Sequence, residues 1–281
     1  MRIESGKKIA IICSGGGMRC AYSAGALMAL VEKYKLTEPH LVIGSSGSAG
    51  TVAYFAAKQF DEIKNVWLNL LSTKKLVSVW RIWNIIDIDY LVDIIFKKEA
   101  RLKVELLGNA STKYFIGIRN LENGLVEHYS NDRYSDIFEV LRASKTMPLI
   151  SRDSVIINGN RYIDGFMGSN INSSVKKAKE EGADVMIMID NSSIIKSKTE
   201  FIFLRIYALL TPGHMGSILK NYLYNDVKNK ILLKDKNIIY IKPRHGLYAS
   251  MFNNKKTRLK RTYEMGYDNV IRNKEIQSLF S

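Results

Sequence analysis

The stretch KIAIICSGGG at residues 8–17 decides how this chain is expected to fold. Its first part is mostly apolar and rich in β-branched residues, which is typical of a buried strand, and the glycines that follow favour a tight turn. The residues from Ala21 to Tyr34 then read as a helix. A strand, a glycine turn and a helix in this order predict the first unit of a parallel sheet.

The same order repeats directly downstream. His40–Ile43 is a short apolar strand, Gly44–Ser48 is a turn of small residues, and Ala49–Gln59 continues as a helix. Further apolar runs of strand length follow at Val185–Ile189 and Ile238–Ile241. These units predict an α/β fold, a three-layer α/β/α sandwich around a largely parallel central sheet.

Two hairpins are expected between these units. Asn123-Gly124 separates apolar runs at 114–118 and 125–129, and Asn-Gly is a strong tight-turn signal. Asn158-Gly159-Asn160 separates a second pair of short runs, and the second of them leads directly into Asp164-Gly165. An aspartate is therefore expected at the end of a strand.

The composition is that of a globular protein. With 281 residues, 46% of them hydrophobic and 25% charged, the chain is expected to form one domain over residues 1–281. No run approaches the roughly 20 apolar residues that cross a bilayer, and the apolar run at 8–13 is too short for a signal-peptide core. The sequence predicts a cytoplasmic protein that contacts a membrane peripherally.

Two segments depart from the strand–helix alternation. Residues 60–107 are aromatic and amphipathic, and we expect them to form a helical cap or lid. Within them, apolar residues at helical spacing favour a core, whereas Trp80-Arg81-Ile82-Trp83 resembles an interfacial anchor, so both interpretations stay open. Residues 245–281 are expected to form a basic helical tail.

The chain offers no pattern for a metal or a cofactor. It has two cysteines, Cys13 and Cys20, and its four histidines stand singly. A nucleotide-binding loop at the glycines is the main structural competitor, but the Gly-x-Gly-x-x-Gly spacing fails at Cys20 and no Gly-Lys-Ser/Thr follows. We therefore expect neither metal nor organic cofactor.

The formal charge of +15 favours an anionic partner. One dense basic run contributes to it: Lys255, Lys256, Arg258, Lys260 and Arg261. The run is either the solvated face of a helix or a binding patch. An anionic membrane surface is the expected partner, and nucleic acid is the less favoured one.

Ser46 stands where a serine nucleophile is expected. It follows an apolar strand, between Gly44-Ser45 and Gly47, so its hydroxyl falls at a sharp strand-to-helix turn. The start of the next helix favours negative charge there. Ser48 replaces the second glycine of a Gly-x-Ser-x-Gly pattern and is the alternative nucleophile, but the glycine directly after the strand favours Ser46.

Four blocks resemble the patatin-like phospholipase family. Ser14–Arg19 is similar to the glycine-rich oxyanion loop with its basic residue, and Gly44–Ala49 is similar to the nucleophile block. Ala143–Pro148 is similar to the Ala-Ser…Pro segment, and Tyr162–Phe166 is similar to the Asp-Gly block. The four occur in the order that the family has, and they cover most of the region from residue 8 to residue 189.

The resemblance implies a serine–aspartate dyad without a catalytic histidine, in which Asp164, followed by Gly165, accepts the proton of Ser46. It implies an oxyanion hole from Gly15, Gly16, Gly17 and Met18, with Arg19 supporting the loop. The implied reaction is hydrolysis of an ester bond in an acyl lipid, expected to be a phospholipid. The departures from the family pattern are Ser48, Cys20 and Asn172, and the alternative function is a lipid-binding module of the same fold that has lost its chemistry.

Overall fold

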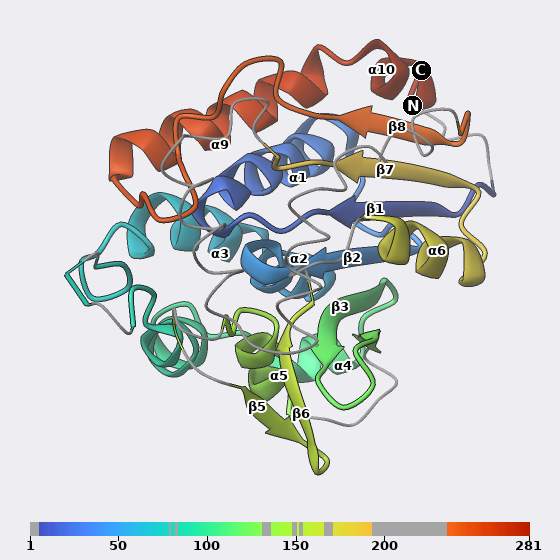
Figure 1. The fold of residues 1–281 in the computed structure, drawn as a ribbon. Helices are drawn as coiled ribbons and strands as arrows, with labels where there is room; N and C mark the ends of the chain where they lie inside the picture. Colours follow the sequence, from blue (N-terminus) through green and yellow to red (C-terminus); the bar gives the residue numbers. More distant parts are fainter. Residues whose placement is uncertain are drawn as a thin grey trace.

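The computed structural model describes residues 6–78, 80–81, 84–130, 136–147, 151, 154–165, 171–192 and 235–281. Its centre is an eight-stranded sheet in the order β5-β6-β3-β2-β1-β7-β8, with β4 also paired to β3 (Figure 1). The strands are β1 (Ile9–Cys13), β2 (Leu41–Ser45), β3 (Lys113–Asn120), β4 (Val126–Ser130), β5 (Val155–Ile157), β6 (Asn160–Asp164), β7 (Val185–Ile189) and β8 (Ile238–Ile241).

Five neighbouring strands of the sheet run parallel: β3, β2, β1, β7 and β8. At the centre, Ile11 of β1 lies opposite Val42 on one side and Ile187 on the other. The pairs β3–β4 and β5–β6 are antiparallel, which confirms both predicted hairpins. The fold is therefore α/β with a mixed, largely parallel sheet, as the sequence predicts.

Successive residues of the parallel strands face two different cores. Ile9 and Ile11 pack in one core with helices α1 (Ala21–Tyr34) and α2 (Ala49–Ala56). Ala10 and Ile12 pack in the other core with α6 (Asn172–Glu180). A sheet that is buried on both faces requires this pattern, because neighbouring side chains of a strand point to opposite faces.

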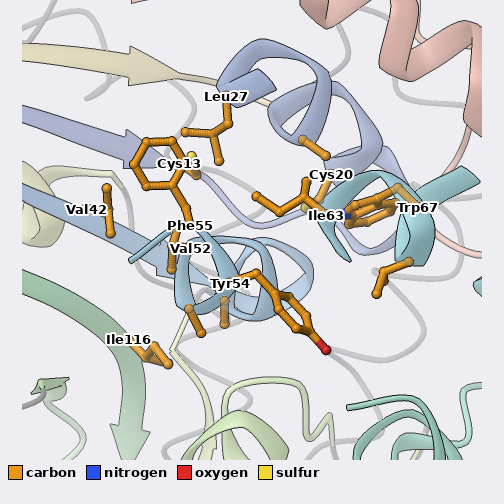
Figure 2. Packing of buried hydrophobic residues seen from close by; sticks show 14 of the residues in the cluster. Cys13, Cys20, Leu27, Val42, Val52, Tyr54, Phe55, Ile63, Trp67 and Ile116 are labelled. Atoms are coloured by element: carbon orange, nitrogen blue, oxygen red, sulfur yellow. The ribbon is translucent and has the colours of Figure 1, made fainter. Parts of the chain in front are cut away.

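Helix α2 shows how the first core is built. Phe55 of α2 lies beside Cys13 of β1 and Val42 of β2, as Figure 2 shows. Both cysteines are buried as free thiols. The helix that follows the second glycine turn thus packs back onto the strands that precede it, as the strand–turn–helix units predict.

The C-terminal segment forms two helices, α9 (Lys256–Ile271) and α10 (Lys274–Leu279). Helix α9 lies along α1 (Figure 1), and the two helices approach closely through glycines. A Cβ atom on Gly25 would overlap the carbonyl group of Tyr263, and one on Gly266 would overlap that of Tyr22. The expected tail is therefore packed into the helical layer, while the five residues of the basic run face solvent.

The described residues of the segment 60–107 form four short helical elements, the last of which ends one residue beyond it: α3 (Phe60–Asn65), η3 (Val66–Leu70), η4 (Tyr90–Glu99) and α4 (Val104–Gly108). Between η3 and η4, Val77 and Ile86 form an isolated antiparallel bridge. Trp80 lies in the loop that this bridge closes and is 90% exposed, whereas η4 buries Ile95 and Phe96. The segment therefore provides core on one side and an exposed tryptophan on the other; Trp83 lies outside the described residues. Among the helices in the described ranges, none is long and apolar enough to span a bilayer.

Candidate active site

Ser46 lies at the junction between β2 and α2. A single turn of 3-10 helix, η2 (Ser46–Ser48), links the strand to the helix. The φ angle of Ser46 is 55°, in the left-handed region that residues other than glycine adopt rarely. Strain of this kind persists only where the surrounding structure imposes it, and a strained serine at a strand-to-helix turn is the geometry of a nucleophile elbow.

Glycines beside Ser46 allow the turn to form. A Cβ atom on Gly44 would lie 2.7 Å from the side chain of Val52. One on Gly47 would lie 2.5 Å from the carbonyl oxygen of Gly17 and 2.9 Å from the Sγ atom of Cys20. The turn that carries Ser46 therefore packs directly against the glycine-rich loop after β1.

Ser45 and Ser48 are held within the fold. They form a capping box at the start of the helix, in which the Ser45 amide donates to the Ser48 Oγ atom (3.1 Å). The Ser48 hydroxyl also lies 3.0 Å from the Cys13 carbonyl oxygen and is completely buried. Ser46 lines a pocket, and Ser48 is not among the described residues that line it.

Strands β2 and β6 pair with the same edge of β3. The amide of Lys113 donates to the carbonyl oxygen of His40, just before β2, and the amide of Leu121 donates to that of Arg161 in β6. Along a strand, the amides of every second residue point to the same edge. Lys113 and Leu121 are an even number of residues apart, so their amides, and with them β2 and β6, lie on the same edge of β3. Strand β4 occupies the opposite edge, since the even-numbered Asn120 donates to Leu125.

The carboxyl ends of β2 and β6 consequently meet end to end beside β3. Ser45 lies opposite Gly117, and Asp164 lies opposite Ile118, the next residue of β3. Ser46, which follows Ser45, and Asp164 both line the same pocket. The fold thus brings together two residues that the sequence separates widely.

Gly165 is needed where the chain leaves β6. A Cβ atom at this position would overlap the backbone of Gly117, so a larger residue would push the end of β6 away from β3. Asp164 itself is 2% exposed. Phe166 and Pro148, from the two neighbouring family-like blocks, lie outside the described residues.

The glycine-rich loop Gly15–Gly17 connects β1 to η1 (Gly17–Cys20). Gly16 and Gly17 have φ angles of 150° and 58°, which favour glycine, and both line the pocket with Met18. The Met18 amide donates to the Met251 carbonyl oxygen (3.1 Å), so it is engaged in this arrangement. The amides of Gly16 and Gly17 have no hydrogen-bond partner within the described part of the chain.

Arg19 is buried beside this loop. Its Nε atom donates to the carbonyl oxygen of Gly16 at 3.3 Å. The guanidinium group therefore links the end of the loop back to its middle, and the side chain is not the solvated charge that an isolated arginine would be.

Two residues that the sequence analysis did not single out also hold the loop. The side chain of Asn191, just after β7, donates to the Ser14 carbonyl oxygen and accepts from the Ser23 amide (3.1 Å). Asp190 accepts from the Ser14 hydroxyl at 3.3 Å and from Tyr240. Strand β7 is the parallel neighbour of β1, so the carboxyl end of β7 lies beside the glycine-rich loop that follows β1. Asp190 and Asn191 could have been expected at the loop only from this strand order.

Ser14 and Asp190 form a second serine–aspartate contact. The Ser14 Oγ atom also accepts from the Asn191 amide (2.7 Å). Neither Ser14 nor Asp190 is among the described residues that line the pocket. We interpret this contact as support for the glycine-rich loop.

The pocket beside Ser46 is largely apolar. Its apolar walls come mainly from α2 and the segment 60–107 and include Tyr54, Ile63, Val66, Trp67, Leu71, Ile86, Leu91 and Phe96. The polar atoms on these walls are bonded elsewhere. Trp67 donates to Thr51 Oγ1 at 2.9 Å, and the Tyr54 hydroxyl donates to the Ala100 carbonyl oxygen.

No histidine within the described ranges lines the pocket. His128 pairs with Gly117 of β3 and interacts with Lys177 and Glu180 of α6. Burial lowers the pKa of His128 to about 4, so its imidazole is neutral at physiological pH. His214 lies outside the described residues.

The fold and this site define a class of α/β protein in which a serine at a strand-to-helix elbow adjoins a glycine-rich loop. Residues 11–174 match the family model described as patatin-like phospholipase. Since the match covers more than half of the chain, the protein belongs to the patatin-like phospholipase family.

The chain also resembles two other proteins. The chain is 24% identical over 188 residues to a curated Escherichia coli (strain K12) protein, described as the uncharacterized protein YjjU. That alignment covers 65% of this chain and 51% of the relative, so the chain spans about half the length of the relative it matches. The crystal structure of VipD from Legionella pneumophila resembles 98% of this chain and 67% of its own, with a TM-score of 0.57 and 13% identity, which is a likeness of fold alone.

Proposed function

We propose that this protein is a lipid acyl hydrolase that cleaves carboxylic ester bonds, with phospholipids as its substrate class. The observation that carries the proposal is that Ser46, Asp164 and the glycine-rich loop line one apolar pocket. The strained φ angle of Ser46 and the full engagement of the Ser48 hydroxyl support Ser46 as the nucleophile. Family membership supports the type of reaction.

The proposed chemistry needs only this chain and water. The Ser46 Oγ atom attacks the ester carbonyl carbon while Asp164 accepts its proton. The free amides of Gly16 and Gly17 stabilise the oxyanion. The proton then passes to the leaving alcohol, and a water molecule, deprotonated by Asp164, releases the fatty acid from Ser46.

The pocket walls fit an acyl chain. They are built from aliphatic and aromatic side chains whose polar atoms are already bonded, so they offer a chain apolar contact without competing hydrogen bonds. The segment 60–107 supplies many of these walls, which supports its role as a cap over the acyl pocket.

The nucleophile is tested by two variants and two readouts. Ser46→Ala is expected to abolish hydrolysis of a p-nitrophenyl ester and labelling by a fluorophosphonate probe, because it removes the attacking oxygen. Ser48→Ala, the matched control, should keep both, with some loss of stability because a buried hydroxyl that bonds the backbone is removed.

Labelling lost only in Ser48→Ala would move the nucleophile to Ser48. A wild-type protein that binds lipid vesicles but neither reacts with the probe nor releases fatty acid would favour the alternative, a lipid-binding module without chemistry.

We further propose that the mouth of the pocket docks on anionic membrane. Asn254, just before the basic run and α9, is bound to the cap segment: its side chain donates to the carbonyl oxygens of Leu71 (2.7 Å) and Thr73 (2.8 Å). Leu71 lines the pocket. The exposed Trp80 belongs to the same segment, so an aromatic side chain and a group of cations both lie on segments that adjoin a wall of the pocket.

A further inference from the structure

Lys145 is the one cation among the described residues that line the pocket. It follows α5 (Ile137–Ala143) and is partly buried. Its Nζ atom lies 3.3 Å from the Leu141 carbonyl oxygen and 3.2 Å from Ser144 Oγ, and 5.6 Å from the centre of the Phe96 ring. An ammonium group in an apolar pocket is costly, so its position calls for a compensating partner.

The backbone ties Lys145 to Asp164. The Asp164 amide donates to the carbonyl oxygen of Thr146, the residue after Lys145, at 2.9 Å. The two side chains line the same pocket and are close enough for their charges to interact. Burial lowers the pKa of Lys145 to about 7, and the Asp164 carboxylate opposes this effect by favouring the ammonium form.

Two groups near this pair, Cys20 and Arg142, add no unpaired charge to it. Burial raises the pKa of the Cys20 thiol to about 12, so this group is neutral near Lys145 at physiological pH. Arg142, on the helix before Lys145, is paired with Asp89 and Asp93 of the cap segment and with Glu139.

Arg119 of β3 also interacts electrostatically with the Asp164 carboxylate. Two cations therefore interact with Asp164, one on β3 and one after α5. Lys145 is the one of the two that faces the pocket.

Taking the proposed function as given, we propose that Lys145 is a positioning residue for Asp164: its ammonium group keeps the buried carboxylate ionised and ready to accept the proton of Ser46. A carboxylate that is removed from water loses hydration, which favours its protonated, inactive form. A cation beside it reverses that preference. Loss of Lys145 should therefore lower the ionised fraction of Asp164 at a given pH without touching the nucleophile or the oxyanion hole.

The sign of the pH effect follows. Activity falls as the pH drops through the pKa of Asp164, because a protonated carboxyl cannot accept the serine proton. Lys145→Met removes the stabilising charge, so the pKa of Asp164 and the acid limb of kcat/KM should move up by about 1–3 pH units. Lys145→Arg keeps a charge that does not titrate, and should keep the acid limb near its original place.

The experiment combines kinetics with a readout that needs no activity. The kcat/KM of a soluble p-nitrophenyl ester is measured against pH, and the Asp164 carboxyl is titrated by 13C NMR, its signal assigned by its absence in Asp164→Asn. Lys97→Met is the matched control, because Lys97 also lies over a phenylalanine ring (5.2 Å, Phe138) and is not among the described lining residues of the pocket. It should leave both curves unchanged.

An unchanged Asp164 titration in Lys145→Met, with circular dichroism showing an intact fold, would overturn the proposal. If Met does not fold at this site, Lys145→Gln serves the same comparison. The two proposals can fail separately. If the protein hydrolyses esters and its acid limb is the same in Lys145→Met, the proposed function stands and the role of Lys145 is rejected. If the Asp164 titration shifts in Lys145→Met but the wild-type protein hydrolyses no ester, the charge interaction stands and the proposed function is rejected.

Discussion

Asp164 is the residue on which the proposed chemistry depends most. Asp164→Asn keeps the shape of the side chain but cannot accept a proton, so we expect kcat for a soluble ester to fall by about 10²–10⁴. The variant should also lose thermal stability, because Lys145 and Arg119 lose the negative charge with which they interact. Asp190→Asn is the informative comparison, since Asp190 contacts a serine outside the pocket. Near-normal turnover in Asp164→Asn together with an inactive Asp190→Asn would reassign the base.

At this scale the sequence singles out residues in motifs and misses residues that act across the fold. Ser46 and Asp164 stand in recognisable blocks. Asn191 stands outside the four blocks, and it meets the glycine-rich loop through the β1–β7 pairing. Lys145 stands inside the Ala143–Pro148 block, but the pattern does not single it out, because its link to Asp164 runs through the hydrogen bond from the Asp164 amide to the Thr146 carbonyl oxygen. Likewise, the bond of Ser48 to Cys13 depends on the pairing of β1 with β2.

Among the elements, the α1–α9 contact is the one most sensitive to a small change. A Cβ atom on Gly266 would overlap the backbone of α1, so Gly266→Ala must force the helices apart. We expect a loss of about 1–3 kcal/mol in the free energy of unfolding, the usual cost of overpacking, measured by denaturant titration.

Gly108→Ala is the control for this prediction. Gly108 is the last residue of helix α4, and a Cβ atom there would meet nothing within 4 Å. This variant should be neutral or more stable by about 0.5–1 kcal/mol, as expected for alanine in place of glycine in a helix. Equal effects of the two substitutions would show that α9 does not pack tightly on α1.

The elements themselves follow the sequence closely where the pattern is strong. Helix α1 and strands β7 and β8 have the predicted bounds, because apolar runs between turn residues leave few alternatives. Local pattern could not reveal that β2 and β6 share one edge of β3, since strand register depends on contacts between distant segments. It also could not show that the basic C-terminal segment forms two helices, one of them packed on α1.

For the molecule as a whole, the proposed docking predicts a salt-dependent affinity for membrane. Anionic vesicles should bind more tightly than neutral ones at low salt, and the difference should fade as salt rises, because exposed charges are screened within about 8 Å at physiological ionic strength. Replacing the five basic-run residues with glutamine should remove up to about 1 kcal/mol of binding free energy for each one, measured by vesicle co-sedimentation.

The soluble ester provides the control, because it reaches Ser46 without docking and should be hydrolysed as before. The fold should also tolerate these changes, since all five side chains are exposed while α9 buries Leu259 and Tyr263 against its neighbours.

Trp80→Ala should lower vesicle binding at every salt concentration, because the contribution of this side chain to binding is apolar and is not screened by salt. Equal binding to neutral and anionic vesicles at low salt would reject the docking proposal, and nucleic acid would be the next partner to test.

The central position of β1 has a consequence for how the chain reaches this structure. Strand β2 follows β1 closely in the sequence, but the other neighbour of β1, strand β7, comes much later. Helix α9, which packs on the face of α1 that carries Gly25, comes later still. During synthesis on a ribosome, the first two strand–helix units therefore wait with one parallel edge unpaired and one helix face uncovered. Contacts between such distant segments slow folding, and bare strand edges invite association with other chains. We expect the nascent N-terminal half to depend on chaperones until α9 emerges, however stable the finished fold is.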